Sequence, residues 1–125
     1  MKFNAHETST PLENTYIKEL TINSREMPGF RNCKELKKVT FVEGCGLSYV
    51  AINGFRDCIS LSEVTLCSSI TSIGNNAFTN TNITKIDLTH VTSLDLSAFN
   101  GTKIKELVIK SNIGCPKVRL AQRSI

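Results

Sequence analysis

Long apolar runs are missing from this sequence of 125 residues. No stretch approaches the roughly eighteen consecutive apolar residues that a membrane-spanning helix requires. The N-terminus turns polar almost at once, at Lys2, Asn4 and His6, so it lacks the apolar segment of a secretory signal. If Met1 is the native start, we expect a cytoplasmic protein that stays inside the cell, with the cell surface as the alternative.

Patterns that bind metals, phosphates or nucleic acids are also missing. The cysteines show no C-x-x-C spacing, and the two histidines, His6 and His90, lie far apart, so we expect no zinc site. No glycine-rich loop could hold a phosphate, and basic residues do not alternate with aromatic ones as in nucleic-acid stacking surfaces. We therefore expect no cofactor, no enzyme activity and no nucleic-acid partner.

The five cysteines are odd in number, which fits free thiols in a reducing compartment. They are Cys33, Cys45, Cys58, Cys67 and Cys115. A cysteine nucleophile needs a partner histidine. His90 beside Cys67 is the pairing to consider, but we expect these cysteines to serve packing instead.

Acidic residues are scarce in the second half of the chain, although the net charge is only +4. Residues 1–66 carry eight basic and eight acidic side chains, whereas residues 67–125 carry seven basic and three acidic ones. A basic end of this kind favours acidic partners. The alternative is a solvated surface that keeps the end of the protein soluble.

A repeated block is present four times. In each copy a small residue precedes phenylalanine, a turn-forming residue and Cys or Thr follow, and an L-x-x-L-x-L segment ends the block. Phe30, Phe55, Phe78 and Phe99 mark the copies, at steps of 25, 23 and 21 residues. The copies occupy residues 29–41, 54–66, 77–88 and 98–109, and a strand-like segment at 17–22 precedes them.

The repeat predicts a solenoid, because no single copy could bury its own apolar face. The alternation that ends each block indicates a half-buried strand, and strands one repeat apart must pair in parallel. The phenylalanines would stack, while Asn32, Asp57, Asn80 and Gly101 would form the turns. The opposite wall would be lined by Leu47 and Val50, Ile70 and Ile73, and Val91 and Leu94. We expect a right-handed coil with a five-stranded parallel sheet, short 3₁₀ turns and little helix.

These blocks resemble the leucine-rich repeat family, specifically its BspA-like branch, whose pattern is I-G-x-x-A-F-x-x-C/T-x-x-L-x-x-I-x-L. Residues 73–78 match that pattern most closely, and the resemblance covers about residues 17–113. It implies a leucine-rich-repeat superhelix of the β/α type that is used for binding and not for catalysis. Family members are typically surface adhesins of bacteria and parasitic protists.

Two columns of residues on the exposed face of the predicted sheet are candidate binding residues. The charged column alternates in sign, so it is either a self-paired ladder or a striped docking surface. It consists of Glu19, Lys38, Glu63, Lys85 and Glu106. The threonine column, which suits strand propensity but is also easily covered by a partner, consists of Thr21, Thr40, Thr65, Asp87 and Val108.

The two ends of the chain differ from the repeats. We assign residues 1–16 to an N-terminal arm or partial cap, 17–111 to the solenoid of four to five repeats, and 112–125 to a basic C-terminal cap or tail. In the tail, Lys117, Arg119 and Arg123 are candidate contacts for an acidic partner. Weak capping would favour end-to-end stacking or a larger assembly.

The function expected from the sequence is a non-catalytic protein–protein interaction module. It would be an adaptor or structural component of a larger intracellular assembly, binding through the concave sheet and the basic C-terminal end. The alternative is a surface or secreted BspA-like adhesin fragment that binds host or matrix proteins.

Overall fold

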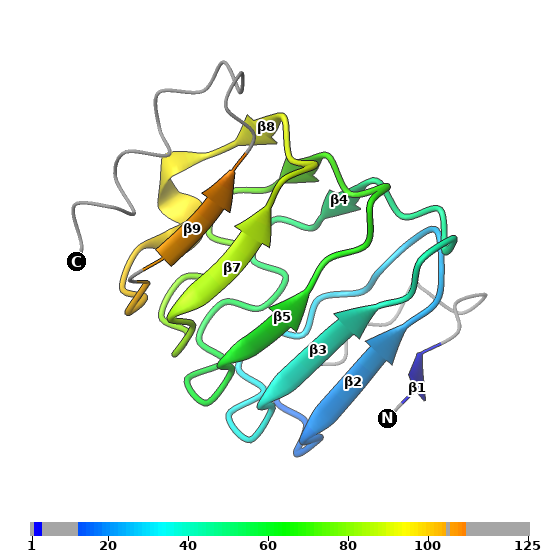
Figure 1. Ribbon diagram of the computed structural model, residues 1–125. Helices are drawn as coiled ribbons and strands as arrows, with labels where there is room; N and C mark the ends of the chain where they lie inside the picture. The colour runs from blue at the N-terminus through cyan, green and yellow to red at the C-terminus, as the bar shows by residue number, and fades with distance from the viewer. Residues whose placement is uncertain (1, 4–12, 105, 110–125) are drawn as a thin grey trace.

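The computed structural model describes residues 2–3, 13–104 and 106–109, which form a coil of short strands joined by turns (Figure 1). The strands are β1 (Lys2–Phe3), β2 (Glu19–Ile22), β3 (Lys38–Phe41), β4 (Tyr49–Val50), β5 (Glu63–Thr65), β6 (Ser72–Ile73), β7 (Lys85–Leu88), β8 (Ser93–Leu94) and β9 (Glu106–Ile109). A 3₁₀ helix, Leu96–Phe99, follows β8, and the Asp95 side chain caps it by accepting a hydrogen bond from the Ser97 N–H. The expectation of short strands with little helix is confirmed.

The first wall of the coil contains β1, β2, β3, β5, β7 and β9, which run in the same direction (Figure 1). The pairs β1–β2, β2–β3, β3–β5 and β7–β9 are all parallel. Among the described residues, however, no hydrogen-bonded ladder joins β5 to β7, although they lie side by side. The wall is therefore a four-stranded sheet, β1-β2-β3-β5, beside a two-stranded sheet, β7-β9.

The predicted continuous five-stranded sheet is therefore wrong at this junction. The strand β5 has only three residues, and both its inward side chain, Val64, and Leu66 directly after the strand are only half-buried. The corresponding residues of β3, Val39 and Phe41, are at most 2% exposed. Val64 and Leu66 thus lie less deeply in the core than their counterparts, at the point where the ladder is interrupted. The right-handed superhelical course stays a prediction.

The second wall lies opposite and consists of β4, β6 and β8, paired in parallel without interruption. Its inward side chains are the three apolar pairs that the sequence predicted for this wall, and all six are buried. Val50 lies beside Ile73, and Ile73 beside Leu94. This wall of the prediction is confirmed.

The core between the walls is centred on the phenylalanine column, Phe30, Phe55, Phe78 and Phe99. Successive rings lie 5.5–5.6 Å apart between centroids and within 10° of parallel. Phe41 from the first wall meets Phe55 edge-on at 6.3 Å. Each ring covers the next repeat, so the column continues across the junction at which the first wall is interrupted.

The turns after each phenylalanine use left-handed backbone conformations. Asn32, Asp57, Asn80 and Gly101 have φ angles of 64°, 63°, 62° and 73°. Asn, Asp and Gly tolerate this region of the backbone map better than other residues do. The sequence prediction of these turns is confirmed, and the backbone N–H of Asn80 donates to the carbonyl of Asn100 in the next repeat.

Candidate functional site

The charged column lies on the outer face of the first wall. Glu19 is directly opposite Lys38, and Lys38 is opposite Glu63, with all three side chains exposed. Lys85 pairs with Glu106 on the other side of the junction. The register thus places residues of opposite charge on neighbouring strands within each sheet, and neighbouring strands lie about 4.8 Å apart. The junction separates Glu63 from Lys85, so the column is divided into a group of three and a group of two.

The threonine column lies beside the charged column and becomes more exposed along the wall. Thr21 and Thr40 are half-buried and in register, and Thr65 is exposed. The exposed carboxylate of Asp87 accepts hydrogen bonds from the N–H and hydroxyl of Thr89. These bonds hold the pKa of Asp87 below its ordinary value.

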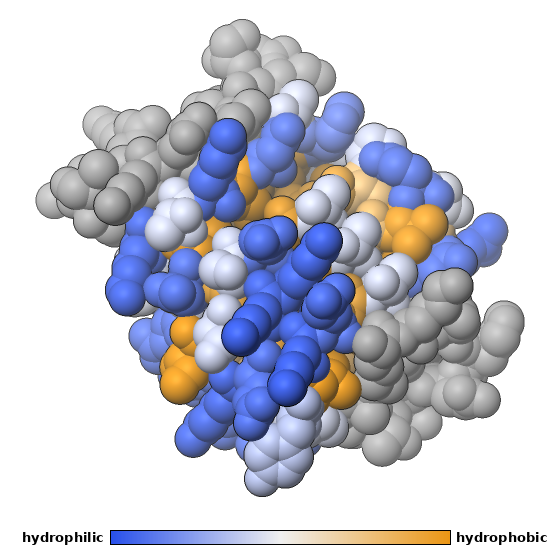
Figure 2. Space-filling view, turned by 60° about the horizontal axis from the view of Figure 1, so that its bottom comes forward, coloured by the Kyte–Doolittle hydropathy of each residue, from blue (hydrophilic) through white to orange (hydrophobic). Residues whose placement is uncertain are grey.

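Figure 2 shows a broad band of hydrophilic residues on the lower side of the molecule in Figure 1.

Several candidate binding residues cannot be placed. Lys117, Arg119 and Arg123 lie outside the described residues. For Glu106 and Val108 the structure gives the backbone pairing, with Lys85 and Asp87 respectively, but not the side-chain surroundings.

A cleft of about 270 Å³ opens at the junction between β5 and β7, and sequence reasoning missed it. Its lining comes from strands and turns of three successive repeats, and no pattern in the sequence connects them: Glu43, Val64, Thr65, Leu66, Cys67, Ile70, Asp87, His90 and Val91. The half-buried Val64 and Leu66 form its apolar part, and two carboxylates with a histidine form its polar part.

Glu43 connects two repeats at this cleft. Its carboxylate accepts hydrogen bonds from the Ser68 N–H, at 3.0 and 3.1 Å, and from the Ser68 hydroxyl at 2.7 Å. These bonds, with a smaller contribution from nearby His90, hold the pKa of Glu43 below its ordinary value. The carboxylate thus fastens the turn after β3 to the turn after β5.

The chemistry of a cysteine nucleophile is not favoured at Cys67. Cys67 and His90 line the same cleft, but the Cys67 sulfur contacts the Ser69 hydroxyl at 3.1 Å and the Cys45 sulfur at 3.6 Å. Burial raises the pKa of the Cys67 thiol. A nucleophilic cysteine needs a lowered pKa instead.

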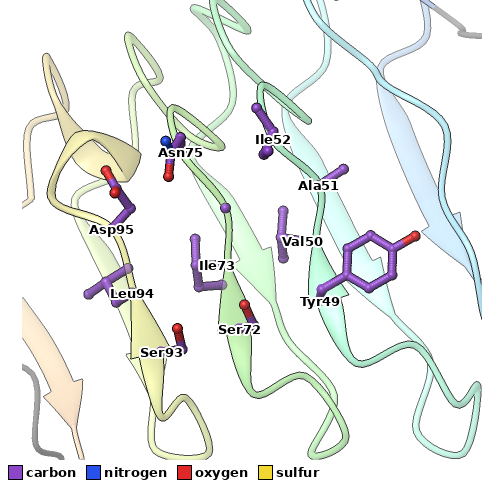
Figure 3. Close-up of a pocket in the computed structure, with 11 residues that line it drawn as sticks. Tyr49, Val50, Ala51, Ile52, Ser72, Ile73, Asn75, Ser93, Leu94 and Asp95 are labelled. Carbon is purple, nitrogen blue, oxygen red and sulfur yellow. The ribbon is translucent and has the colours of Figure 1, made fainter.

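A shallow groove of about 610 Å³ runs over the outer face of the second wall (Figure 3). Tyr49, Ser72 and Ser93 lie in register across it. Figure 3 shows Tyr49 at one end of the groove and Asp95 at the other, with Ile52 on the turn above Tyr49. Tyr49 is 38% and Ile52 66% exposed, so this end of the groove presents apolar surface.

Metal sites and membrane spans each require a particular arrangement of residues in the described part of the chain. Within it, no three His, Cys, Asp or Glu side chains are placed to hold a metal ion. In the same residues, no helix is long and apolar enough to cross a membrane.

Comparisons with known proteins agree with this architecture. Comparison with curated proteins gave no match. Among solved structures, the chain is similar to a leucine-rich cell surface protein from Faecalibacterium prausnitzii A2-165, with a TM-score of 0.51 and 23% sequence identity. The match covers 77% of this chain and 40% of that protein, so it supports the fold alone. The family model of the BspA-type leucine-rich repeat region, in six copies, matches residues 3–115. The chain therefore belongs to the BspA-type leucine-rich repeat family.

Proposed function

We propose that this chain is a non-catalytic protein–protein interaction module that binds its partner through the outer face of the first wall. The observation that carries the proposal is the exposed, in-register group Glu19, Lys38 and Glu63 beside the threonine column. Leucine-rich repeats of this family typically bind proteins, which supports the same conclusion.

The surface suits recognition by charge pattern. Rows of alternating charge contribute little to stability when exposed, but a partner with the opposite pattern gains specificity and a faster association rate from them. The neighbouring threonines are uncharged and flat, so covering them costs less desolvation than covering charged groups. In this proposal the partner crosses the charged column and extends over Thr40 and Thr65.

The proposal includes an adaptor or structural role in a larger intracellular assembly. The basic residues Lys117, Arg119 and Arg123 of the tail would add contacts to an acidic partner, and the repeat ends would allow stacking on other repeats. A cell-surface role is the second candidate. It is supported by the solved structure of similar fold, which is described as a leucine-rich cell surface protein.

Charge reversal at Lys38 tests the binding surface. The Lys38→Glu variant should lose most of the partner that the wild-type chain captures from native cell lysate, because three acidic residues would then stand side by side. Lys34→Glu is the matched control, since Lys34 is exposed on a turn outside the charged column. Loss of capture by both variants, or by neither, would contradict the proposed surface.

The location is tested separately with the wild-type chain. A partner set from the lysate that is lost at high salt supports the intracellular role, because salt screens exposed charges. Binding to intact foreign cells or matrix proteins, without a lysate partner, would support the surface role instead.

A further inference from the structure

We propose that Cys45 and Cys67 are a modification site, at which a small peroxide oxidant closes a disulfide between two adjacent repeats. Their sulfur atoms lie 3.6 Å apart, although the residues are 22 positions apart in the sequence. Both side chains are buried, Cys45 at 8% exposure and Cys67 at 1%. This inference stands independently of the proposed protein-binding surface.

The backbone around the two cysteines is already held at a suitable separation. Cys45 lies in the turn after β3, where its N–H donates to the Val42 carbonyl, and Cys67 follows β5. The strands β3 and β5 are direct neighbours, and paired strands lie about 4.8 Å apart. The turns that carry Cys45 and Cys67 follow these neighbouring strands, and they bring the two sulfur atoms into contact at 3.6 Å.

Glu43 fastens the same two turns. It lies two residues before Cys45 and binds the N–H and hydroxyl of Ser68, the residue after Cys67. The two sulfur atoms must approach from 3.6 Å to a bond length of about 2.05 Å, which rotation of the side chains can provide. Little movement of the backbone is needed, because the bonds from Glu43 to Ser68 already hold the two turns that carry Cys45 and Cys67 next to each other.

The hydrogen bonds around Cys67 also orient its sulfur. The Ser69 hydroxyl donates its single proton to the Leu47 carbonyl at 2.6 Å. The contact of 3.1 Å between Ser69 and Cys67 therefore has the Cys67 thiol as donor. The sulfur lone pairs of Cys67 are left to accept from the Cys45 thiol.

The oxidant reaches the pair through the cleft at the junction of β5 and β7, since Cys67 lines that cleft. A peroxide molecule is close to water in size. Burial raises the pKa of Cys67, so the reaction is slow and stoichiometric: the minor thiolate form of Cys67 attacks a peroxide oxygen, the O–O bond breaks, and a sulfenic acid and hydroxide form. The second thiol then attacks this sulfur, the S–O bond breaks, and water leaves. In total, two thiols and one hydrogen peroxide give one disulfide and two water molecules.

A second pair of cysteines, Cys33 and Cys58, also lies in neighbouring repeats and can be compared with Cys45 and Cys67. Both are fully buried, and the Cys58 thiol donates to the Phe30 carbonyl at 3.0 Å. Neither lines the cleft. The hydrogen bond between the two thiols raises the pKa of Cys58 and lowers that of Cys33 to about 6, so burial away from the cleft, and not protonation, is what protects this pair. We expect this pair to stay reduced under conditions that oxidise Cys45 and Cys67.

Peptide mapping by mass spectrometry after peroxide treatment tests the proposal. The reduced full-length protein, carrying Cys115→Ser to remove the cysteine outside the described residues, is exposed to hydrogen peroxide and then alkylated. A linked peptide pair containing Cys45 and Cys67, lighter by two hydrogen atoms or about 2 Da, is expected. The melting temperature should rise by about 5–10 °C.

Variants separate this site from oxidation elsewhere. Cys45→Ser and Cys67→Ser should each abolish the linked peptide and the rise in melting temperature. Cys58→Thr is the matched control, because Thr81 and Thr102 occupy the same position in later repeats, and it should leave both unchanged. The proposal would be overturned if both Cys45 and Cys67 are alkylated when the peroxide-treated protein is denatured without reductant, or if Cys33 is linked to Cys58 instead.

Discussion

At the scale of single residues, the phenylalanine column packs each repeat against the next. Phe55 is fully buried, with Phe30 and Phe78 stacked on its two faces and Phe41 against its edge. Apolar burial and ring contacts with three neighbours act together at this position. Each ring therefore stabilises the adjacent repeats as well as its own.

Phe55→Ala should lower the free energy of unfolding by about 3–5 kcal/mol, because it leaves a cavity between two rings. Urea denaturation followed by circular dichroism measures this. Ile59→Ser, at a side chain that is 56% exposed, is the control and should change stability by less than about 0.5 kcal/mol. Equal effects of the two substitutions would contradict the role of the column.

Asn80 combines a strained backbone with a bond to the neighbouring repeat. Its φ angle is 62°, and its side-chain amide donates to the Asp57 carboxylate at 2.8 Å. Asn80→Ala should cost about 1–2 kcal/mol, since alanine is disfavoured in the left-handed region. Asn80→Gly should be less damaging, because glycine adopts this region freely. Thermal melts compare the two, and an alanine variant as stable as the glycine variant would refute the backbone argument.

At the scale of elements, the sequence predicted the positions of the main strands and their parallel pairing, but not the interruption between β5 and β7. The L-x-x-L-x-L pattern is as regular at residues 61–66 as in the other repeats, yet Val64 and Leu66 are half-buried there. Period-two alternation indicates which side chains face inward. How deeply they sit depends on the alignment of two neighbouring repeats, which no local pattern records. For the same reason the cleft, which is lined by residues of three successive repeats, could not be predicted.

The bond between turns at Glu43 should make stability depend on pH. The pKa of Glu43 in the folded protein is below its ordinary value of 4.5, mainly because of Ser68. The contribution of Glu43 to the free energy of unfolding is therefore fully present above pH 4.5 and is lost as the pH falls through the lowered pKa. The gap in melting temperature between wild type and Glu43→Gln should be visible at pH 7 and shrink towards pH 3.

Ser68→Ala is the companion variant for this test. It removes the hydroxyl donor but keeps the backbone N–H that binds Glu43. Its effect should be smaller than that of Glu43→Gln and confined to the same pH range. A gap that stays constant from pH 7 to pH 3 would show that Glu43 acts through something other than its charge.

At the scale of the whole molecule, one wall is interrupted while the other wall and the phenylalanine column are continuous. The ladder β4-β6-β8 passes the junction of β5 and β7, and Phe55 stacks on Phe78 across it. Across the junction, the described repeats are thus joined by the second wall and by the phenylalanine column, but not by a ladder in the first wall. This predicts local opening on one face without separation into two independently unfolding halves.

Native-state hydrogen exchange tests this arrangement. Amides at the facing edges of β5 and β7 should open at a free energy at least about 1 kcal/mol lower than those between β2 and β3. Urea unfolding should nevertheless follow a single transition by fluorescence and circular dichroism alike. Two separated transitions would mean that the junction divides the molecule.

The constancy of register, despite repeats of unequal length, means that this molecule could grow or shrink by whole units. Extra residues are absorbed in the turns, while Glu19, Lys38 and Glu63 still align side by side. Duplicating one unit in the gene would add a strand without disturbing its neighbours and would widen the recognition face by about 4.8 Å. The number of repeats would then set the width of the recognition face. Proteins descended from one gene could bind partners of different widths by changing the number of repeats, while using the same kind of contact.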